Sequence, residues 1–210
     1  MRYPFVGFEG PIASGKTTHA KLLADRLQST LLLEQFAGNE FLADFYNQND
    51  RWALPMQLSF LALRSAQLQT VVAPLQSAVV VDYSRLKDPT LAELLLIDRE
   101  LRLYQQVSIA FAGTLLDHDL IVYLDADNAV LLDRIRRRGR PYEAHIDGAY
   151  QDRLRGAYEA AFAANPHLTI LRYNTSHLDL SSAADIDELH EAILASLPWT
   201  TSILNNLGEK

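Results

Sequence analysis

The sequence contains no cysteine, which excludes disulfide bridges and thiolate metal sites. It also lacks any run near the roughly 18 consecutive apolar residues that a membrane-spanning helix needs, and its first residues lack the apolar core of a signal peptide. The chain has fewer basic than acidic residues, with 19 Lys and Arg against 26 Asp and Glu, and its net charge is −7. An acidic chain is a poor general nucleic-acid binder. We therefore expect a cytoplasmic protein with no membrane and no nucleic-acid partner.

The remaining composition is that of an ordinary globular protein. Hydrophobic residues make up 49% and charged residues 21% of the 210 residues, which suits one domain with a sizeable core. There is no internal repeat and no low-complexity linker. The sequence predicts a single domain over residues 1–197, followed by a short polar tail over 198–210.

One glycine-rich stretch, GPIASGKT at residues 10–17, fits the phosphate-loop pattern G-x-x-x-x-G-K-[ST]. An apolar strand is expected before it at 3–8, and a helix after it at 19–27, which is the required setting. Backbone N–H groups in such a loop point at an anion, and the helix adds the positive end of its dipole. The loop predicts bound ATP or another nucleoside triphosphate, with Lys16 on the phosphates and the Thr17 hydroxyl on Mg²⁺. The expected phosphate-binding residues are Gly10, Ala13, Ser14, Gly15, Lys16, Thr17 and Thr18.

Strands and helices alternate along the rest of the chain. Apolar strands are expected at 3–8, 29–36, 78–81, 120–124 and 168–173. Helices are expected at 19–27, 40–46, 52–72, between 88 and 116 in one or two pieces, 128–138, 147–164 and 184–197. This α/β pattern predicts a parallel sheet of about five strands covered by helices on both faces. A ligand should then bind at the carboxyl ends of the strands.

Two acidic residues lie at predicted strand ends. Glu34 closes the strand at 29–36, which we expect beside the first strand, so its carboxylate should face the phosphate loop and can accept the proton of an attacking hydroxyl. Asp82 follows the strand at 78–81 and is placed to hold Mg²⁺ or its water. The alternatives are a solvated glutamate at a strand end and an aspartate that begins a turn.

Five arginines lie within residues 134–140. They end a predicted helix and are interrupted by Gly139, so part of the segment can close as a lid over about 134–147. The planar, always charged arginine fork suits the charge that develops on a transferred phosphate. The candidates for this role are Arg134, Arg138 and Arg140. For Arg136 and Arg137 we favour a solvated helix face.

A spaced set of residues resembles the deoxyribonucleoside kinase family over about residues 3–162, in particular bacterial members acting on deoxyadenosine, deoxyguanosine or deoxycytidine. The matching positions are Glu34, Phe45-Tyr46, Arg51-Trp52, Gln57, Arg64, Asp82-Tyr83-Ser84, Asp88, the arginine segment 134–140 and Glu143. The segment MQLSFL at 56–61 is similar to the helix that floors the nucleoside pocket in that family.

The resemblance implies a P-loop kinase fold and an enzyme of nucleotide salvage that uses ATP and Mg²⁺ to phosphorylate the 5′-hydroxyl of a deoxynucleoside. It implies the catalytic residues Glu34, Lys16, Arg138 and Arg140, and the metal ligands Thr17 and Asp82. It implies the nucleoside-binding residues Glu34, Tyr46, Met56, Gln57, Arg64, Asp82, Asp88 and Glu143. In this set Glu34 is the base, Tyr46 and Glu143 bind the 3′-hydroxyl, and Gln57 pairs with the nucleobase. A homodimer through the helices between 52 and 116 is also implied.

The chain departs from the family pattern in two places. Many members have an acid-Arg-Ser triplet after the third strand, whereas Tyr83 stands here in the place of that arginine. We consider Arg85 a candidate to compensate. Asn39 stands where some members have an aromatic residue, so the wall around the sugar is expected to differ.

Two other functions remain open from the sequence. A nucleotide kinase of the thymidylate type shares the loop, but its acceptor is already phosphorylated and Glu34 would repel that dianion. A non-catalytic nucleotide-binding module would keep the loop without the register of Gln57, Arg64, Asp88 and Glu143. Within the nucleoside kinase interpretation, an Arg64–Asp88 pair at the far end of the base pocket favours a base with an exocyclic amino group. This suggests deoxyadenosine, deoxycytidine or deoxyguanosine over thymidine.

Overall fold

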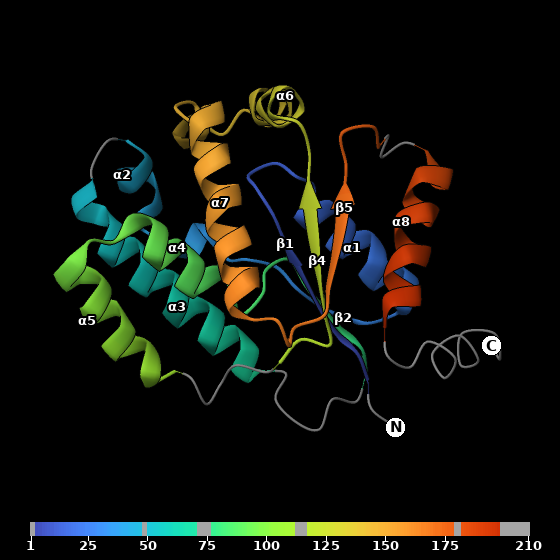
Figure 1. Cartoon of the computed structure of the whole chain (residues 1–210), viewed down its shortest axis with the longest axis horizontal. Helices are drawn as coiled ribbons and strands as arrows, with labels where there is room; N and C mark the ends of the chain where they lie inside the picture. Colours follow the sequence, from blue (N-terminus) through green and yellow to red (C-terminus); the bar gives the residue numbers. More distant parts are fainter. Residues whose placement is uncertain (1–2, 48–49, 71–76, 112–116, 179–181, 198–210) are drawn as a thin grey trace.

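The computed structural model describes residues 3–47, 50–70, 77–111, 117–178 and 182–197. Within them the chain forms a five-stranded parallel sheet in the order β2-β3-β1-β4-β5, seen in Figure 1. The strands are β1 (Phe5–Glu9), β2 (Thr30–Leu32), β3 (Val79–Val81), β4 (Leu120–Asp125) and β5 (Ile170–Asn174). The predicted α/β fold with a parallel sheet is confirmed.

The order of the strands differs from the prediction at one point. The strand expected at 29–36 is short, and it pairs with β3 at the edge of the sheet and not with β1. Burial explains this order, because β3 is apolar and buried throughout, whereas β2 has an exposed first residue. Glu34 therefore lies two residues beyond β2, in the loop that follows it.

Helices cover both faces of the sheet. On one face, α1 (Lys16–Leu27) and α8 (Ala183–Ser196) pack against alternate strand residues such as Val6 and Phe8. On the other face lie α3 (Ala53–Gln69), α4 (Lys87–Leu95) and α7 (Gly148–Ala164). The helix α5 (Asp98–Ile109) packs on α3 and α4, farther from the sheet. This two-sided burial follows from the period of two in each strand.

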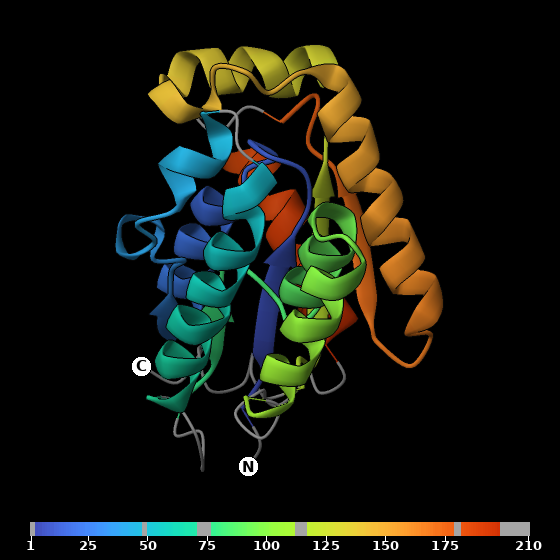
Figure 2. The same ribbon diagram turned by 90° about the vertical axis from the view of Figure 1, so that its left-hand side faces the viewer.

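The carboxyl ends of the strands point toward a group of helices that closes this end of the molecule. The helix α6 (Asn128–Arg138) spans the predicted residues, ends at Gly139 in the left-handed region (φ 67°), and lies across this end in Figure 2. The short helix α2 (Leu42–Tyr46) contacts the 3₁₀ turn Pro141–Glu143 beside it. Further 3₁₀ turns are Phe36–Gly38 and Asp50–Trp52.

Several predicted helix boundaries shift. The region 88–116 divides into α4 and α5, and α4 begins at Lys87, so Asp88 lies in its first turn. Residues 71–72 and 112–116 and the predicted tail 198–210 lie outside the described residues. In the part of the chain that is described, no helix is long and apolar enough to cross a membrane.

Candidate active site

The phosphate loop joins β1 to α1 and has an unusual backbone. Gly10 and Gly15 have φ of 141° and 103°, and Ala13 has φ of 66°. A Cβ atom at Gly10 would lie 1.9 Å from the carbonyl oxygen of Leu124 in β4, so only glycine fits there. This backbone holds the loop against the sheet. The loop residues line the cavity described below.

Lys16 folds back over this loop. Its Nζ donates to the carbonyl oxygens of Gly10 and Pro11, at 2.8 and 2.7 Å. Burial and the nearby charge of Lys87 lower the pKa of Lys16 to about 7. An arriving phosphate can therefore replace two neutral carbonyls as the partner of this ammonium group.

Asp82 joins the phosphate loop to Glu34. One carboxylate oxygen accepts a hydrogen bond from the Thr17 hydroxyl at 2.7 Å, and the other accepts from the backbone N–H of Glu34 at 2.6 Å. Asp82 is almost fully buried. The predicted metal ligands, Thr17 and Asp82, are thus in contact, and the predicted base is fixed beside them.

The Glu34 carboxylate is buried among cations. Arg64 donates to its Oε1 through Nε, at 2.8 Å, and through Nη2, while Lys87 donates to its Oε2 at 2.9 Å. Burial alone raises the pKa of Glu34, but Arg64 and Lys87 outweigh it and lower that pKa to about 2. Arg64 also binds Asp88, so the predicted Arg64–Asp88 pair is present but extends to Glu34.

A cavity of about 320 Å³ contains most of the predicted site. The predicted residues that line it are Gly10, Ala13, Ser14, Gly15, Lys16, Thr17, Thr18, Glu34, Tyr46, Met56, Gln57, Arg64, Arg134, Arg138, Arg140 and Glu143. Asp82 and Asp88 do not line it and act from behind Thr17 and Arg64. The phosphate loop with the start of α1 supplies one part of the cavity, and α2, α3 and α4 supply another. The segment 134–143 adds its arginines and Glu143.

The second half of the cavity is largely apolar and aromatic, with Gln57 as a polar group within it. Gln57 is fully buried, and its Oε1 has no hydrogen-bond partner among the described residues. Its Nε2 contacts only the Met56 sulfur there, at 3.8 Å. Tyr46 stacks on Tyr142 with ring centres 5.8 Å apart. A buried amide oxygen without a hydrogen-bond partner costs free energy, so the Gln57 side chain is available to bind a polar ligand.

The arginine segment also lines the cavity. Arg138 donates two hydrogen bonds to Glu143, at 3.0 and 2.6 Å, and Arg140 donates one at 3.3 Å. Arg134 is held by Thr175, through its hydroxyl at 3.0 Å and its carbonyl at 2.7 Å. The side chains of Arg136 and Arg137 are 70% and 81% exposed and pair with Asp133, in agreement with the predicted solvated face.

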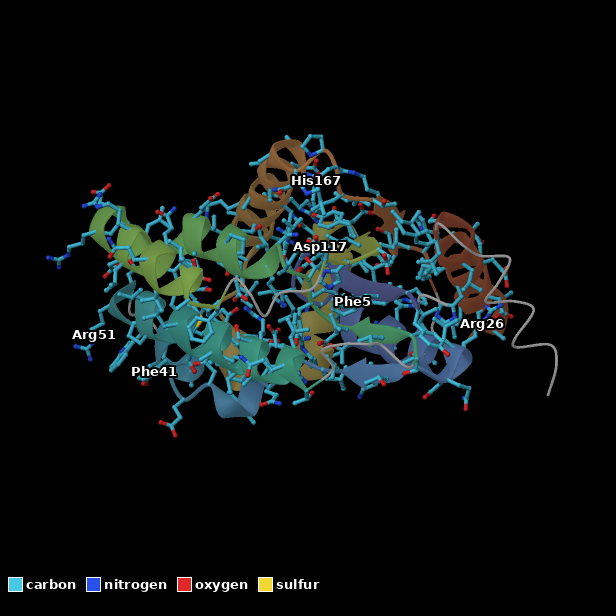
Figure 3. All side chains as sticks on the ribbon, turned by 90° about the horizontal axis from the view of Figure 1, so that it is seen from below. Phe5, Arg26, Phe41, Arg51, Asp117 and His167 are labelled. Carbon is cyan, nitrogen blue, oxygen red and sulfur yellow. The ribbon has the colours of Figure 1, made fainter. Side chains whose placement is uncertain are left out.

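The prediction that Arg85 compensates for the missing arginine is wrong. Arg85 pairs with Asp117, just before β4, and Figure 3 shows Asp117 on the side where the strands begin. The Tyr83 hydroxyl donates to Gln67 at 2.8 Å. Asn39 is buried and binds the backbone of Met56 and Phe41, so it acts as a structural bridge.

Two further buried charged groups belong to the site. Lys87 was not indicated by the sequence, because the helical region is expected from residue 88 and Lys87 lies just before it. Glu9 lies under the loop, with its carboxylate accepting from the Ser84 N–H at 2.7 Å and from the Tyr158 hydroxyl at 2.6 Å. Burial raises the pKa of Glu9. Glu9 is the last residue of β1, and its place at a strand end was the available signal for this residue.

Comparison with known proteins agrees with this geometry. A family model described as deoxynucleoside kinase matches residues 6–197. The chain is 32% identical over 175 residues to deoxyguanosine kinase of Bacillus subtilis (strain 168), covering 80% of this chain and 84% of that relative. It is 27% identical over 179 residues to the deoxyadenosine/deoxycytidine kinase of the same organism, covering 81% and 82%.

Among solved structures, deoxyadenosine kinase from M. mycoides with bound dCTP superimposes with a TM-score of 0.76 at 20% identity. The match covers 91% of this chain and 99% of that one, which supports the fold. Because the family model spans nearly all of the described residues and the site contains its expected parts, the chain belongs to the deoxynucleoside kinase family and is an enzyme that phosphorylates deoxynucleosides.

Proposed function

We propose that the enzyme transfers the γ-phosphate of ATP, or of another nucleoside triphosphate, to the 5′-hydroxyl of its deoxynucleoside, with Glu34 as the base. The hydroxyl oxygen forms a bond to the γ-phosphorus, the bond from that phosphorus to the β-γ bridging oxygen breaks, and the hydroxyl proton passes to Glu34. The products are the deoxynucleoside monophosphate and ADP. The observation that carries the proposal is the buried, ionised Glu34 carboxylate, fixed beside the phosphate loop through Asp82.

The donor phosphates would bind the loop. Lys16 exchanges its two carbonyl partners for the phosphates, and Arg134, Arg138 and Arg140 close on them as a lid over about 134–147. Arg138 and Arg140 now bind Glu143. Both line the cavity, and their side chains are about one-third exposed, so both are available to bind the phosphates.

The implied Mg²⁺ fits the Thr17–Asp82 pair, because hydroxyl and carboxylate oxygens are ligands that this ion prefers. Among the described residues, no cluster of three or more His, Cys, Asp or Glu side chains suits a metal. This accords with an ion that takes few ligands from the protein and the rest from phosphate and water. When bound, Mg²⁺ neutralises charge on the β- and γ-phosphates. Thr17 and Asp82 hold it next to the loop.

The deoxynucleoside would occupy the aromatic half of the cavity. Gln57, whose amide oxygen lacks a partner within the described chain, pairs with the base, and Met56 packs beneath it. Tyr46 and Glu143 bind the 3′-hydroxyl. We propose a base with an exocyclic amino group, as the resemblance of the Arg64–Asp88 pair implies. In this pair Arg64 lines the cavity, and Asp88 binds it from behind.

We also propose a homodimer that acts in the cytoplasm. The helix α5 and the turn before it expose large apolar side chains, with Ile97 71% and Ile109 74% exposed. Pairing of two copies through α5 would cover these side chains. Sedimentation of the wild type and of Ile109→Glu tests the pairing, which predicts a smaller species for the variant.

A screen of the four deoxynucleosides with ATP, each with and without EDTA, tests the proposed reaction. We expect product from at least one deoxynucleoside, with turnover lost in EDTA. Glu34→Gln should lower turnover by about 10²- to 10⁴-fold, the range of general base catalysis, while thermal stabilisation by the nucleoside remains. Unchanged turnover in this variant would show that the base is elsewhere.

The same assay separates the other two functions. A thymidylate-type kinase would be stabilised by deoxynucleoside monophosphates and would phosphorylate them in preference to nucleosides. A non-catalytic module would bind ATP without transfer to any acceptor. The buried carboxylate of Glu34 argues against the first, because it would lie close to a dianionic acceptor.

A further inference from the structure

Lys87 is a buried cation at the centre of the site. It lies in the first turn of α4, and its side chain is 11% exposed. Its Nζ lies 2.9 Å from Glu34 Oε2, and the residue lines the same cavity as the phosphate loop. Its charge also lowers the pKa of Lys16. Lys87 therefore lies between the acceptor side and the donor side of the site.

The two oxygens of Glu34 are occupied to different extents. Oε1 accepts two hydrogen bonds from Arg64, through Nε and Nη2. Oε2 accepts one, from Lys87. Each carboxylate oxygen has two lone pairs, so Oε1 is filled and Oε2 retains one. An incoming hydroxyl can donate its proton to Oε2, which places the hydroxyl oxygen next to the ammonium group of Lys87.

The other cations nearby are directed elsewhere. Arg85 pairs with Asp117, and Arg138 and Arg140 pair with Glu143. Tyr83, which stands where the family pattern has an arginine, donates to Gln67. Within the described part of the chain, the cations that contact Glu34 are Arg64 and Lys87.

We infer that Lys87 is a positioning residue for phosphoryl transfer: it holds Glu34 Oε2 toward the attacking hydroxyl and supplies the positive charge that the missing arginine would bring. This inference rests on Glu34 being the base. It assigns separate tasks to the two cations, with Arg64 fixing Oε1 and bridging to Asp88, and Lys87 fixing the oxygen that reacts.

Removal and chemical rescue of the amine test the inference. In Lys87→Ala, with the screened deoxynucleoside and ATP, we expect kcat to fall by about 10²-fold, the loss typical of one positioned donor, and the nucleoside KM to change far less. Added ethylammonium should restore part of kcat, because it can occupy the space left by the side chain. Neutral ethanol at the same concentration should not. Lys87→Arg should retain more kcat than the alanine variant.

Arg85→Ala is the matched control, since it removes one positive charge two residues away, outside the cavity. It should keep wild-type kcat. If Lys87→Ala does not fold, as judged by circular dichroism and by thermal stabilisation with ATP, Lys87→Met keeps the apolar stem and should show the same loss of kcat with little change in KM, without rescue by ethylammonium.

Wild-type kcat in Lys87→Ala, a loss confined to KM, or a kcat loss that ethylammonium does not relieve would overturn the inference. Glu34→Gln, measured in parallel, distinguishes a wrong role for Lys87 from a wrong base. If Glu34→Gln is inactive and Lys87→Ala is not, the role of Lys87 alone is wrong. If Glu34→Gln keeps turnover, the proposed base is wrong and the role of Lys87 falls with it.

Discussion

Arg64 lies between Glu34 and Asp88 and donates hydrogen bonds to both buried carboxylates. The two acids respond in opposite directions. Two cations outweigh burial at Glu34 and lower its pKa to about 2, whereas burial outweighs Arg64 at Asp88 and raises its pKa. One arginine thus serves an ionised carboxylate on the cavity side and a second acid behind it.

Arg64→Met should destabilise the protein strongly. It leaves two buried acids without their shared partner, and breaking a buried ion pair typically costs about 3–5 kcal/mol. Urea denaturation followed by circular dichroism measures the change. Arg26→Met is the control, because Arg26 forms ion pairs at the surface and should cost less than about 1 kcal/mol. Equal effects of the two changes would contradict a buried network.

Arg138→Ala should lower turnover by about 10²-fold, since it removes charge that acts on the transferred phosphate. Nucleoside binding should be affected much less. Steady-state kinetics with varied nucleoside and saturating ATP separates the two effects. Arg137→Ala, in the same helix but 81% exposed, should match the wild type. A change in nucleoside affinity alone for Arg138→Ala would show that the residue does not act on phosphate.

Two glycine substitutions should have opposite effects. In Gly10→Ala the new Cβ would meet the Leu124 carbonyl oxygen at 1.9 Å, and the φ of 141° adds strain, so we expect a loss above about 2 kcal/mol and no thermal stabilisation by ATP. In Gly156→Ala no atom lies within 4 Å of the new Cβ in α7, so a gain of up to about 1 kcal/mol is expected. Thermal unfolding with and without ATP measures both. A tolerated Gly10→Ala would contradict the loop geometry.

Stability should fall in mild acid because of His118. This ring stacks on Phe5 at 4.1 Å, and burial lowers its pKa to about 3, against about 6.5 in the unfolded chain. The unfolded state therefore binds the proton first, and stability is lost as the pH falls from about 6.5 toward 3. The loss from this group at pH 5 should be about 2 kcal/mol. Unfolding free energies at pH 7.5 and 5 should show a smaller difference in His118→Gln, and an unchanged difference would exclude this group as the cause.

The parts of the site that depend on local sequence were predictable. The phosphate loop needs glycines, a lysine and a flanking strand and helix, and all of these lie within one short stretch of chain. Glu34 and Asp82 were predictable as site residues because strand ends in a parallel sheet meet at one edge. The solvated helix face favoured for Arg136 and Arg137 is confirmed by their exposure.

The parts that depend on packing were not predictable. The edge position of β2 follows from the greater burial of β3, which is a comparison between distant segments. The contact of Lys87 with Glu34 depends on where α4 begins and on how α4 packs against α3. Arg85 was the predicted replacement because it is closer in sequence to the position of the missing arginine. In the structure it pairs with Asp117.

The side chain of Gln151, in the helix after the arginine segment, binds the phosphate loop from 139 residues away in the sequence. Its amide accepts from the Ile12 N–H at 3.1 Å and donates to the Ile12 carbonyl at 2.9 Å. Both bonds go to the backbone of residue 12, so they depend on the amide of residue 151 and not on the side chain of residue 12. A chimera that imports residues 134–164 from a relative will therefore keep a well-shaped loop only if the graft carries an amide at this one position.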